Sequence, residues 1–198
     1  MPTKTINKQR KQTTNLLNKQ KVNKINRNKL KVLFGKEITK KQIKEAAEIS
    51  EKSFNTKEDK DQMKSDYNLF LKIAKKFPAF FSILTLNNKV IGDNIILPST
   101  KKLMLSFFEN KLNEKQLTKI LINKPVKRPE CLFLAEIVID KKYRRKGDAS
   151  FLLDKALKHL KHIEGHKLPI YYWAWSKEGE FFTIKELEKE KLDFYFKN

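Results

Sequence analysis

Apolar residues recur along this chain with two different spacings, one typical of amphipathic helices and the other of half-buried strands. The helical spacing is found in residues 40–54, 59–76, 101–122, 150–163 and 180–191. Alternating or short continuous apolar runs, typical of strands, are found in residues 30–34, 79–86, 90–97, 132–139, 168–176 and 192–196. This interleaved order predicts a fold of the α/β (α+β) class in which helices flank one sheet.

Residues with special backbone or capping preferences mark the ends of several predicted elements. Thr39 has the side chain of a helix N-cap, and Pro78 ends the second predicted helix because the residue before a proline is extended. The Asn-Asn-Lys turn at residues 87–89 lies between two strand-like runs and predicts a β-hairpin. Gly92 indicates either a bulge or a close backbone approach, and Asn113 marks a break within residues 101–122.

The most informative stretch is residues 132–150, in which an apolar run leads through a basic, glycine-containing turn into a helix. A helix that begins directly after such a loop points unpaired backbone N–H groups and the positive end of its dipole outward. This arrangement favours an anion at that place. We interpret the stretch as the binding site for the pyrophosphate of a coenzyme.

The turn itself reads Arg144-Arg145-Lys146-Gly147-Asp148-Ala149. It resembles the acetyl-coenzyme A loop of the GNAT (GCN5-related) N-acetyltransferase superfamily, which has the form Arg/Gln-x-x-Gly-x-Gly/Ala after a buried strand. The resemblance in element order extends over about residues 30–196. It implies a GNAT-like, mixed and mainly antiparallel twisted sheet. It also implies an enzyme that transfers an acetyl group directly from acetyl-CoA to a primary amine in a ternary complex.

The resemblance further implies how the chain holds acetyl-CoA, its co-substrate, without a metal. In the family, the fourth and fifth strands separate and the pantetheine arm forms hydrogen bonds with exposed backbone. The pyrophosphate lies on the N–H groups of the loop, to which a hydroxyl from the first helical turn can be added. The implied coenzyme-binding residues are Ile137, Val138, Ile139, Arg144, Arg145, Lys146, Gly147, Asp148, Ala149 and Ser150.

Glu136 is an acid within an otherwise apolar run. Burial would raise its pKa and suit it to accept a proton from an ammonium substrate, directly or through water. Glu136 is therefore the candidate general base. The alternative is an ion pair between Glu136 and one of the many lysines.

The chain departs from the family pattern in three places. Residues 101–122 form a helical insertion between the third and fourth strands, either a lid over the substrate cleft or a packing element. The usual tyrosine acid is replaced by Lys189; Tyr172 is the candidate acid, and Tyr171, Tyr195 and bulk water are alternatives. The last β-hairpin of the family looks truncated, so a shortened C-terminal end is expected after residues 192–196.

The formal net charge is +21 at pH 7, from 44 basic and 23 acidic residues. Such a charge attracts nucleic acid, anionic lipid or acidic small molecules, and it disfavours a polycationic acceptor unless local charge overrides the global field. Cys131 is the only cysteine, so no internal disulfide forms, and we expect it to be a small buried hydrophobe. No apolar run reaches the roughly 18 residues of a membrane helix, and no secretory signal follows the basic start. We expect a cytoplasmic protein without a membrane partner.

Residues 1–29 are rich in lysine, asparagine and glutamine and contain no acidic residue. We expect them to form a flexible basic tail before an acetyltransferase domain in residues 30–198. The tail either contacts RNA or another acidic partner, or it is merely solvated. A second hypothesis for the whole chain is therefore a catalytically degenerate GNAT fold that serves as a basic RNA- or ribosome-binding module.

Histidines and tryptophans form two further groups of candidate residues. His159, His162 and His166 have helical spacing, but no cysteine or acid cluster completes a zinc site, so we expect surface histidines and no metal. Trp173 and Trp175 lie on one face of the predicted strand, either as core residues or as walls of an acceptor pocket.

Overall fold

The computed structural model describes residues 29–54, 61–164, 168–174 and 176–197. The chain divides into two compact units, Met1–Leu30 and Lys31–Asn198, and apart from Leu30 the elements of the fold belong to the second unit. The tail expected in residues 1–29 lies outside the described residues except for Lys29, so its flexibility stays a prediction. Within the described part of the chain, no helix has the length and apolar character needed to cross a membrane.

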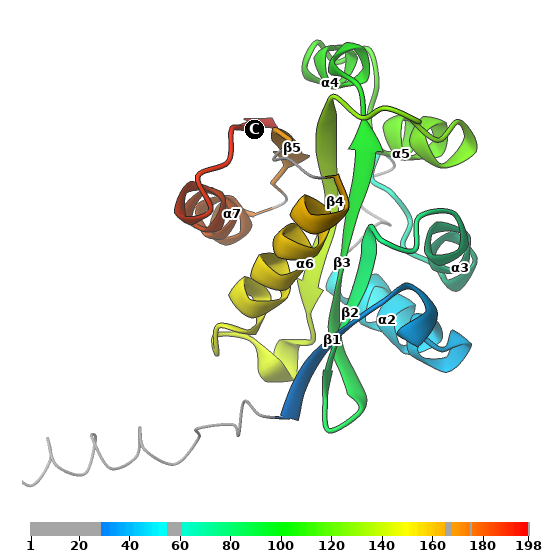
Figure 1. Ribbon diagram of the computed structural model, residues 1–198, viewed down its shortest axis with the longest axis vertical. Helices are drawn as coiled ribbons and strands as arrows, with labels where there is room; N and C mark the ends of the chain where they lie inside the picture. Colours follow the sequence, from blue (N-terminus) through cyan, green and yellow to red (C-terminus); the bar gives the residue numbers. More distant parts are fainter. Residues whose placement is uncertain (1–28, 55–60, 165–167, 175, 198) are drawn as a thin grey trace, which may run out of the picture. The chain divides into compact units, whose positions relative to one another are not determined.

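Six strands form one sheet in the order β1-β2-β3-β4-β5-β6 (Figure 1). The pairs β2/β3 and β3/β4 are antiparallel, whereas β4/β5 and β5/β6 are parallel and are each connected through a helix. This mixed sheet confirms the predicted fold class. The strands are β1 (Leu30–Phe34), β2 (Phe81–Leu86), β3 (Lys89–Ser99), β4 (Cys131–Ile139), β5 (Ile170–Trp173) and β6 (Phe194–Lys197).

Helices cover both faces of the sheet (Figure 1). On one face, four helices contribute to a core that includes Phe70, Phe107 and Leu117, together with Phe81 and Phe133 from the sheet. On the other face, two helices pack on a second core. The burial of these apolar side chains supplies most of the driving force for folding. The first group is α2 (Lys40–Ser53), α3 (Tyr67–Lys76), α4 (Lys101–Phe108) and α5 (Glu114–Asn123), and the second is α6 (Asp148–Glu164) and α7 (Lys177–Lys189).

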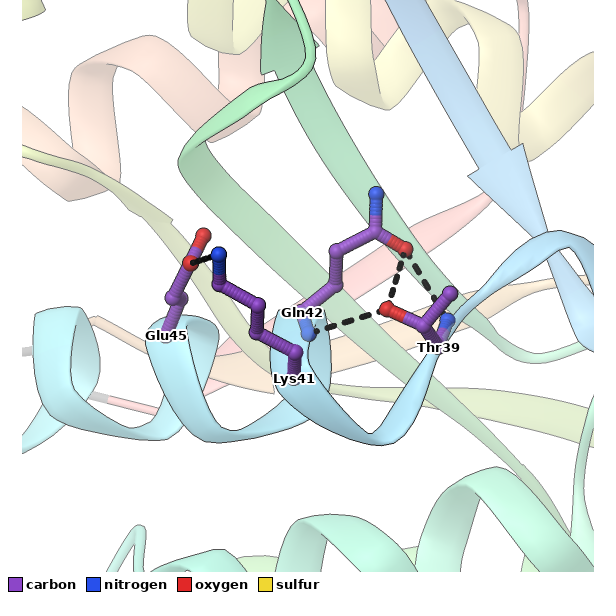
Figure 2. Close-up of polar contacts among 4 residues, drawn as sticks. All are labelled: Thr39, Lys41, Gln42 and Glu45. Carbon is purple, nitrogen blue, oxygen red and sulfur yellow. Dashed lines mark hydrogen bonds and ion pairs between the residues drawn. The ribbon is translucent and has the colours of Figure 1, made fainter.

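Helix α2 begins at the residue that the sequence predicts, because Thr39 and Gln42 form a reciprocal cap (Figure 2). The Gln42 N–H donates to Thr39 Oγ1 at 3.3 Å, and the Thr39 N–H donates to Gln42 Oε1 at 2.9 Å. This cap satisfies two N–H groups, those of Thr39 and Gln42, at the start of the helix. In the same part of α2, Lys41 and Glu45 form an i,i+4 ion pair with 3.9 Å between Nζ and Oε1 (Figure 2).

Helix α3 begins later than predicted. The sequence pattern places a helix over residues 59–76, but the described helix begins at Tyr67. The Asp66 side chain accepts a hydrogen bond from the Leu69 N–H at 2.9 Å, so it caps the helix there. As a result, Gln62, Met63 and Ser65 belong to a non-helical segment that leads into α3.

The helical insertion between β3 and β4 is confirmed as two helices, α4 and α5, separated near Asn113 as predicted. Thr100 and Asn113 cap them by accepting from Leu103 and Gln116 N–H groups at 3.3 and 2.8 Å. Leu117 and Leu121 of α5 are almost fully buried in the core. The insertion therefore packs on the sheet, and its role as a lid stays a prediction.

The predicted hairpin between β2 and β3 is confirmed, with a two-residue turn. Asn87 and Asn88 both have positive φ, 52° and 64°, as a type I′ turn requires. Gly92 follows a register shift in β3, where Ile91 has no partner between the pairs Leu84↔Gly92 and Thr85↔Val90. A Cβ at Gly92 would lie 2.4 Å from the carbonyl oxygen of Val138. Both interpretations of Gly92, bulge and close backbone approach, therefore hold.

A second register shift, between β3 and β4, decides where Glu136 points. Ile95 pairs with Glu136 and Ile96 pairs with Leu134, so Ala135 is an extra residue in β4. Such a bulge resets the alternation of side chains between the two faces. Glu136 consequently lies on the face covered by α2, where it meets Ser50.

Candidate functional site

Strands β4 and β5 are paired over only part of their length. Their parallel pairing covers Leu132–Leu134 of β4 and Ile170–Tyr172 of β5, while β4 continues to Ile139. Beyond Leu134, β4 keeps β3 on one edge but has no described strand on the other. Backbone donors and acceptors on this open edge are available to an extended ligand.

A cavity of about 520 Å³ lies at this opening, and we call it the loop cavity. Nine of the ten coenzyme-binding residues that the sequence implies line it, and their role in binding stays a prediction. The exception is Lys146, whose ammonium lies 5.7 Å from the centre of the Tyr143 ring. The nine are Ile137, Val138, Ile139, Arg144, Arg145, Gly147, Asp148, Ala149 and Ser150.

The backbone of the loop turns sharply before α6. Arg145 and Gly147 have φ values of +63° and +79°, and the Gly147 carbonyl accepts the Phe151 N–H at 3.0 Å. Arg144 holds the loop in place, since its Nε donates to the Ile139 carbonyl at 2.7 Å and its Nη2 donates to Ser53 Oγ at 3.1 Å. The first turn of α6 then faces the loop cavity with its dipole positive toward it. Arginine side chains and a helix N-terminus together fit a pyrophosphate group.

Ser150 has a more limited role than the sequence implied. Its hydroxyl donates to Glu186 Oε1 of α7 at 2.9 Å. The bond uses the one proton of the hydroxyl and connects α6 to α7. In this arrangement Ser150 offers an anion its backbone N–H and no hydroxyl donor.

A smaller cavity of about 150 Å³, which we call the central cavity, adjoins the loop cavity. Phe54, Ile137, Ser176 and Gly179 line both. The polar side chains of the central cavity come from four parts of the chain: the segment before α3, the start of α5, the bulged part of β4, and β5 with the α7 region. They include Gln62, Ser65, Glu114, Glu136, Tyr172 and Thr183.

Glu136 is 5% exposed and accepts hydrogen bonds on both carboxylate oxygens. Ser50 donates to Oε1, and Ser65 donates to Oε2 at 2.6 Å. Among the described residues, no lysine or arginine pairs with Glu136, so this part of the chain gives the ion-pair alternative no support. The carboxylate is held by neutral donors at the wall of a cavity.

Asp93 of β3 completes a buried acid pair with Glu136. Ser50 Oγ lies 3.2 Å from Asp93 Oδ2 and also bonds to Glu136, so it connects the two carboxyl groups. Burial raises the pKa of both groups, and the negative charge of Glu136 raises the pKa of Asp93 further, well above its ordinary value of 3.8. Because two adjacent buried carboxyl groups disfavour a second negative charge, the pair retains a proton to higher pH than exposed acids do, with the stronger upward shift at Asp93.

Of the three tyrosines considered as acids, Tyr172 alone lines a described cavity. Burial, and then the charge of Glu180, raises the pKa of Tyr172 to about 12, so its hydroxyl stays protonated and able to donate. Its Oη has no hydrogen-bond partner among the described residues. Tyr171 is fully buried with its hydroxyl bonded to Ser99 at 2.7 Å, and Tyr195 is 48% exposed on β6.

Several of these residues were missed at the sequence level. Asp93 interrupts an apolar strand in the same way as Glu136, so the same signal was present there. Ser50 occurs on the apolar face of α2, which is also a detectable exception. Gln62 and Glu114 give no signal, because they come from irregular or helix-terminal positions whose neighbours are set by the fold.

The histidines, the cysteine and the tryptophans considered from the sequence are found in the following surroundings. His159 stacks on Phe34 with ring centres 4.0 Å apart, and burial raises the pKa of the Cys131 thiol to about 11. Within the described ranges, no group of three or more histidine, cysteine or acidic side chains is placed to hold a metal ion. His166 and Trp175 lie outside the described residues. Trp173 lines the central cavity.

An opened pair of parallel strands, with a basic, glycine-containing loop before a helix and a buried carboxylate nearby, fits the arrangement of acyl-coenzyme A-dependent acyltransferases. The sequence model of the acetyltransferase (GNAT) family matches residues 43–178. The chain belongs to this family, whose members use acetyl-CoA as co-substrate. The hypothesis of an RNA- or ribosome-binding module finds no support.

Solved structures match this chain at low sequence identity. The loading GNATL domain of CurA from Lyngbya majuscula is 13% identical with a TM-score of 0.50, over 70% of this chain and 61% of that chain. A mosquito arylalkylamine N-acetyltransferase-like protein, 5b, is 14% identical with a TM-score of 0.51, over 81% and 82%. Diaminobutyrate acetyltransferase EctA from Paenibacillus lautus, in complex with L-2,4-diaminobutyric acid and coenzyme A, is 11% identical with a TM-score of 0.38, over 65% and 56%. This chain therefore spans less than two thirds of the CurA domain and of EctA. A search of curated proteins finds no match.

Proposed function

We propose that this protein is an N-acetyltransferase that transfers the acetyl group of acetyl-CoA directly to a primary amine. The observation that carries the proposal is that β4 and β5 separate, with the loop cavity and the central cavity both at this opening. The two cavities share four lining residues, so a donor in one and an acceptor in the other can meet. Direct transfer in a ternary complex requires such a meeting.

The loop cavity fits the coenzyme. The pyrophosphate lies on the N–H groups of residues 145–149, with Arg144 and Arg145 supplying positive charge. The pantetheine arm extends along the open edge of β4 and forms strand-like hydrogen bonds with the backbone of residues 137–139. One N–H of this run donates to the thioester oxygen as negative charge develops there.

Acetyl transfer then requires a balanced movement of one acetyl group and its protons. The neutral amine attacks the thioester carbon, the N–C bond forms, and the C–S bond breaks to release the coenzyme thiolate. The proton lost by the attacking nitrogen goes to Glu136, directly or through the Ser65 hydroxyl that donates to it. The thiolate takes a proton from the Tyr172 hydroxyl, whose raised pKa keeps it protonated until this step.

Asp93 supports Glu136 as a positioning residue. In this proposal Asp93 holds the retained proton, so it places a neutral carboxyl group behind the base and leaves one negative charge in the pair. Ser50 connects the two groups and orients the Glu136 carboxylate. A carboxylate with a raised pKa is a better proton acceptor than an exposed one.

Thermal melting with and without acetyl-CoA tests the coenzyme site. At a ligand concentration about 100 times Kd, binding adds about 2.7 kcal/mol and raises the Tm of a chain of this size by about 5–10 °C. Thiol release in the presence of a panel of primary amines tests the transfer. Absence of a Tm shift at saturating acetyl-CoA contradicts the proposal.

A further inference from the structure

Beyond the central cavity lies a third cavity of about 430 Å³, which we call the side cavity. Glu114 and Trp173 line both the central and the side cavity, so the two adjoin each other there. An acceptor whose amine reaches Glu136 can therefore extend past Glu114 and Trp173. The side cavity is also lined by Asp61 and Lys197.

The charge of this route is opposite to the charge of the whole chain. Glu114 and Glu136 line the central cavity, and no lysine or arginine is among its described lining residues. Among the described residues that line the side cavity, the acids are Asp61 and Glu114 and the one cation is Lys197. The chain as a whole has 44 lysines and arginines against 23 acids. A positively charged group is thus favoured locally, although the surface repels it.

Glu114 is fixed in its position. It is the first residue of α5, is 8% exposed, and accepts the Met63 N–H on Oε2 at 3.1 Å. Next to it, the Asn113 side-chain amide donates to Asp61 Oδ1 at 2.8 Å, which holds the second carboxylate of the side cavity. Ordering these groups before binding lowers the entropy cost of recognising a cation.

Two buried polar atoms point independently to a ligand. Gln62 is 6% exposed and Tyr172 is 2% exposed, and both line the central cavity. Gln62 Oε1 and Tyr172 Oη have no hydrogen-bond partner within the described part of the chain. Buried polar atoms are satisfied in almost all native structures. Because a carbonyl oxygen only accepts, Gln62 requires an N–H or O–H donor, which an amine supplies.

Lys197, the cation of the side cavity, is engaged by Phe107. Its ammonium donates to the Phe107 carbonyl at 3.1 Å and lies 4.6 Å from the centre of the Phe107 ring. The indole of Trp173, on the wall between the two cavities, can attract an ammonium group through a cation–π interaction.

From this geometry we infer that the acceptor is a diamine or polyamine. One amine reacts beside Glu136, Gln62 and Tyr172, and a second, protonated amine is bound at Glu114 and Trp173. The inference rests on the proposed acetyl transfer and adds the chemical class of the acceptor. Surface charge alone disfavours a polycationic acceptor. The inference differs from that expectation, because local carboxylates decide binding in a narrow cavity.

The test compares acceptors of matched length with the full-length protein. Rates of coenzyme thiol release are measured at saturating acetyl-CoA for α,ω-diamines of three to six carbons, the corresponding monoalkylamines, and the corresponding ω-amino acids. For at least one length, we expect kcat/KM of the diamine to exceed that of the monoamine by about tenfold or more. The ω-amino acid is the poorest acceptor of each set.

Glu114→Gln removes the charge but keeps an oxygen for the Met63 N–H. We expect this variant to lose most of the diamine preference, because kcat/KM falls much more for the diamine than for the monoamine, while the acetyl-CoA Tm shift is retained. Glu188→Gln, on the exposed face of α7, is the matched control and keeps the preference.

A monoamine as good as the diamine at every length, or an equal loss for both acceptors in Glu114→Gln, overturns the inference alone. Absence of the acetyl-CoA Tm shift overturns the proposed function and the inference together. If the shift is present but no acceptor in the panel reacts, calorimetric binding in the presence of coenzyme A decides: tighter binding of the diamine supports the inference, and equal binding overturns it.

Discussion

Glu136 combines burial, two hydroxyl donors and a position at the wall of the central cavity. If it is the general base, Glu136→Gln removes the proton acceptor without removing the group that fills the space. We expect kcat to fall by about 10²-fold or more, with an unchanged acetyl-CoA Tm shift. Steady-state thiol release and thermal melting measure the two quantities. An unchanged kcat would show that another group takes the proton.

Glu136 also predicts the pH dependence of the reaction. Because burial raises its pKa, the carboxylate form appears at higher pH than for an exposed glutamate. We expect kcat/KM to increase with pH through this raised pKa, and the increase to disappear in Glu136→Gln. A pH–rate profile with a saturating donor checks this, and the same ascending limb in the variant would assign it to a different group.

Asp93 has a measurable effect on stability. Its pKa is raised in the folded state, so between its ordinary value of 3.8 and the folded value only the unfolded chain has released the proton. The folded state then binds more protons, and the free energy of unfolding decreases as pH rises through this window. Asparagine cannot ionise. We expect Asp93→Asn to gain stability relative to the wild type as pH increases from 4 to 8, measured by urea unfolding.

Asp193→Asn, at an exposed position, is the control for Asp93→Asn and should show the smaller change over the same range. A stability difference between Asp93→Asn and the wild type that does not vary with pH contradicts the assignment of a retained proton to Asp93.

How far the sequence predicts single residues depends on how they break a pattern. Glu136 was identified because an acid stands in an apolar strand, and Asp93 could have been identified in the same way. Gln62 and Glu114 break no pattern, since polar residues are ordinary in loops and at helix starts. Their role comes from the contacts between elements, which periodicity does not contain.

At the scale of elements, the loop before α6 makes a direct prediction. Gly147 has φ +79°, a conformation that costs other residues about 1–2 kcal/mol, and it lines the loop cavity. Gly147→Glu adds this strain, a bulky side chain and a negative charge where a phosphate binds. We expect it to abolish the acetyl-CoA Tm shift. Gly147→Ala adds the strain without the charge, and we expect it to keep part of the shift; equal shifts in the wild type and Gly147→Glu would place the coenzyme elsewhere.

The close approach of β3 and β4 predicts a stability effect. A Cβ at Gly92 would lie 2.4 Å from the Val138 carbonyl oxygen and 2.6 Å from Ile139 Cδ1, so the strands must separate to admit it. We expect Gly92→Ala to cost about 1–3 kcal/mol in urea unfolding. In contrast, Gly179→Ala in α7 meets only Ser176 Oγ at 3.2 Å and is expected to change stability little. Equal stability of the two variants contradicts the close packing at Gly92.

Element boundaries were predictable where local chemistry sets them. Thr39 and Asn113 cap helices at the expected positions. The predicted start of α3 was several residues too early. The helical periodicity extends to residues before Asp66, but the fold keeps that segment non-helical. The bulge at Ala135 and the separation of β4 from β5 result from long-range pairing, so no local pattern predicts them without the family resemblance.

At the scale of the whole molecule, the described residues that line the three cavities all belong to the unit Lys31–Asn198. We therefore expect removal of residues 1–28 to leave the acetyl-CoA Tm shift and the thiol-release rate unchanged. Melting and rate measurements on the shortened chain check this. A lost shift would show that the basic tail contributes to the coenzyme site.

The open edge of β4 has a consequence for how this protein tolerates change. A ligand that binds to main-chain N–H and C=O groups is indifferent to which apolar side chains project from Ile137 and Ile139, provided that the strand remains. Substitutions at these two positions that keep the strand intact are therefore expected to leave donor binding largely unchanged. By contrast, the proposed function concentrates inactivating changes at two points, the left-handed Gly147 and the Glu136 carboxylate. On that proposal, a descendant of this chain that loses Gly147 or Glu136 loses donor binding or proton transfer and still keeps the fold.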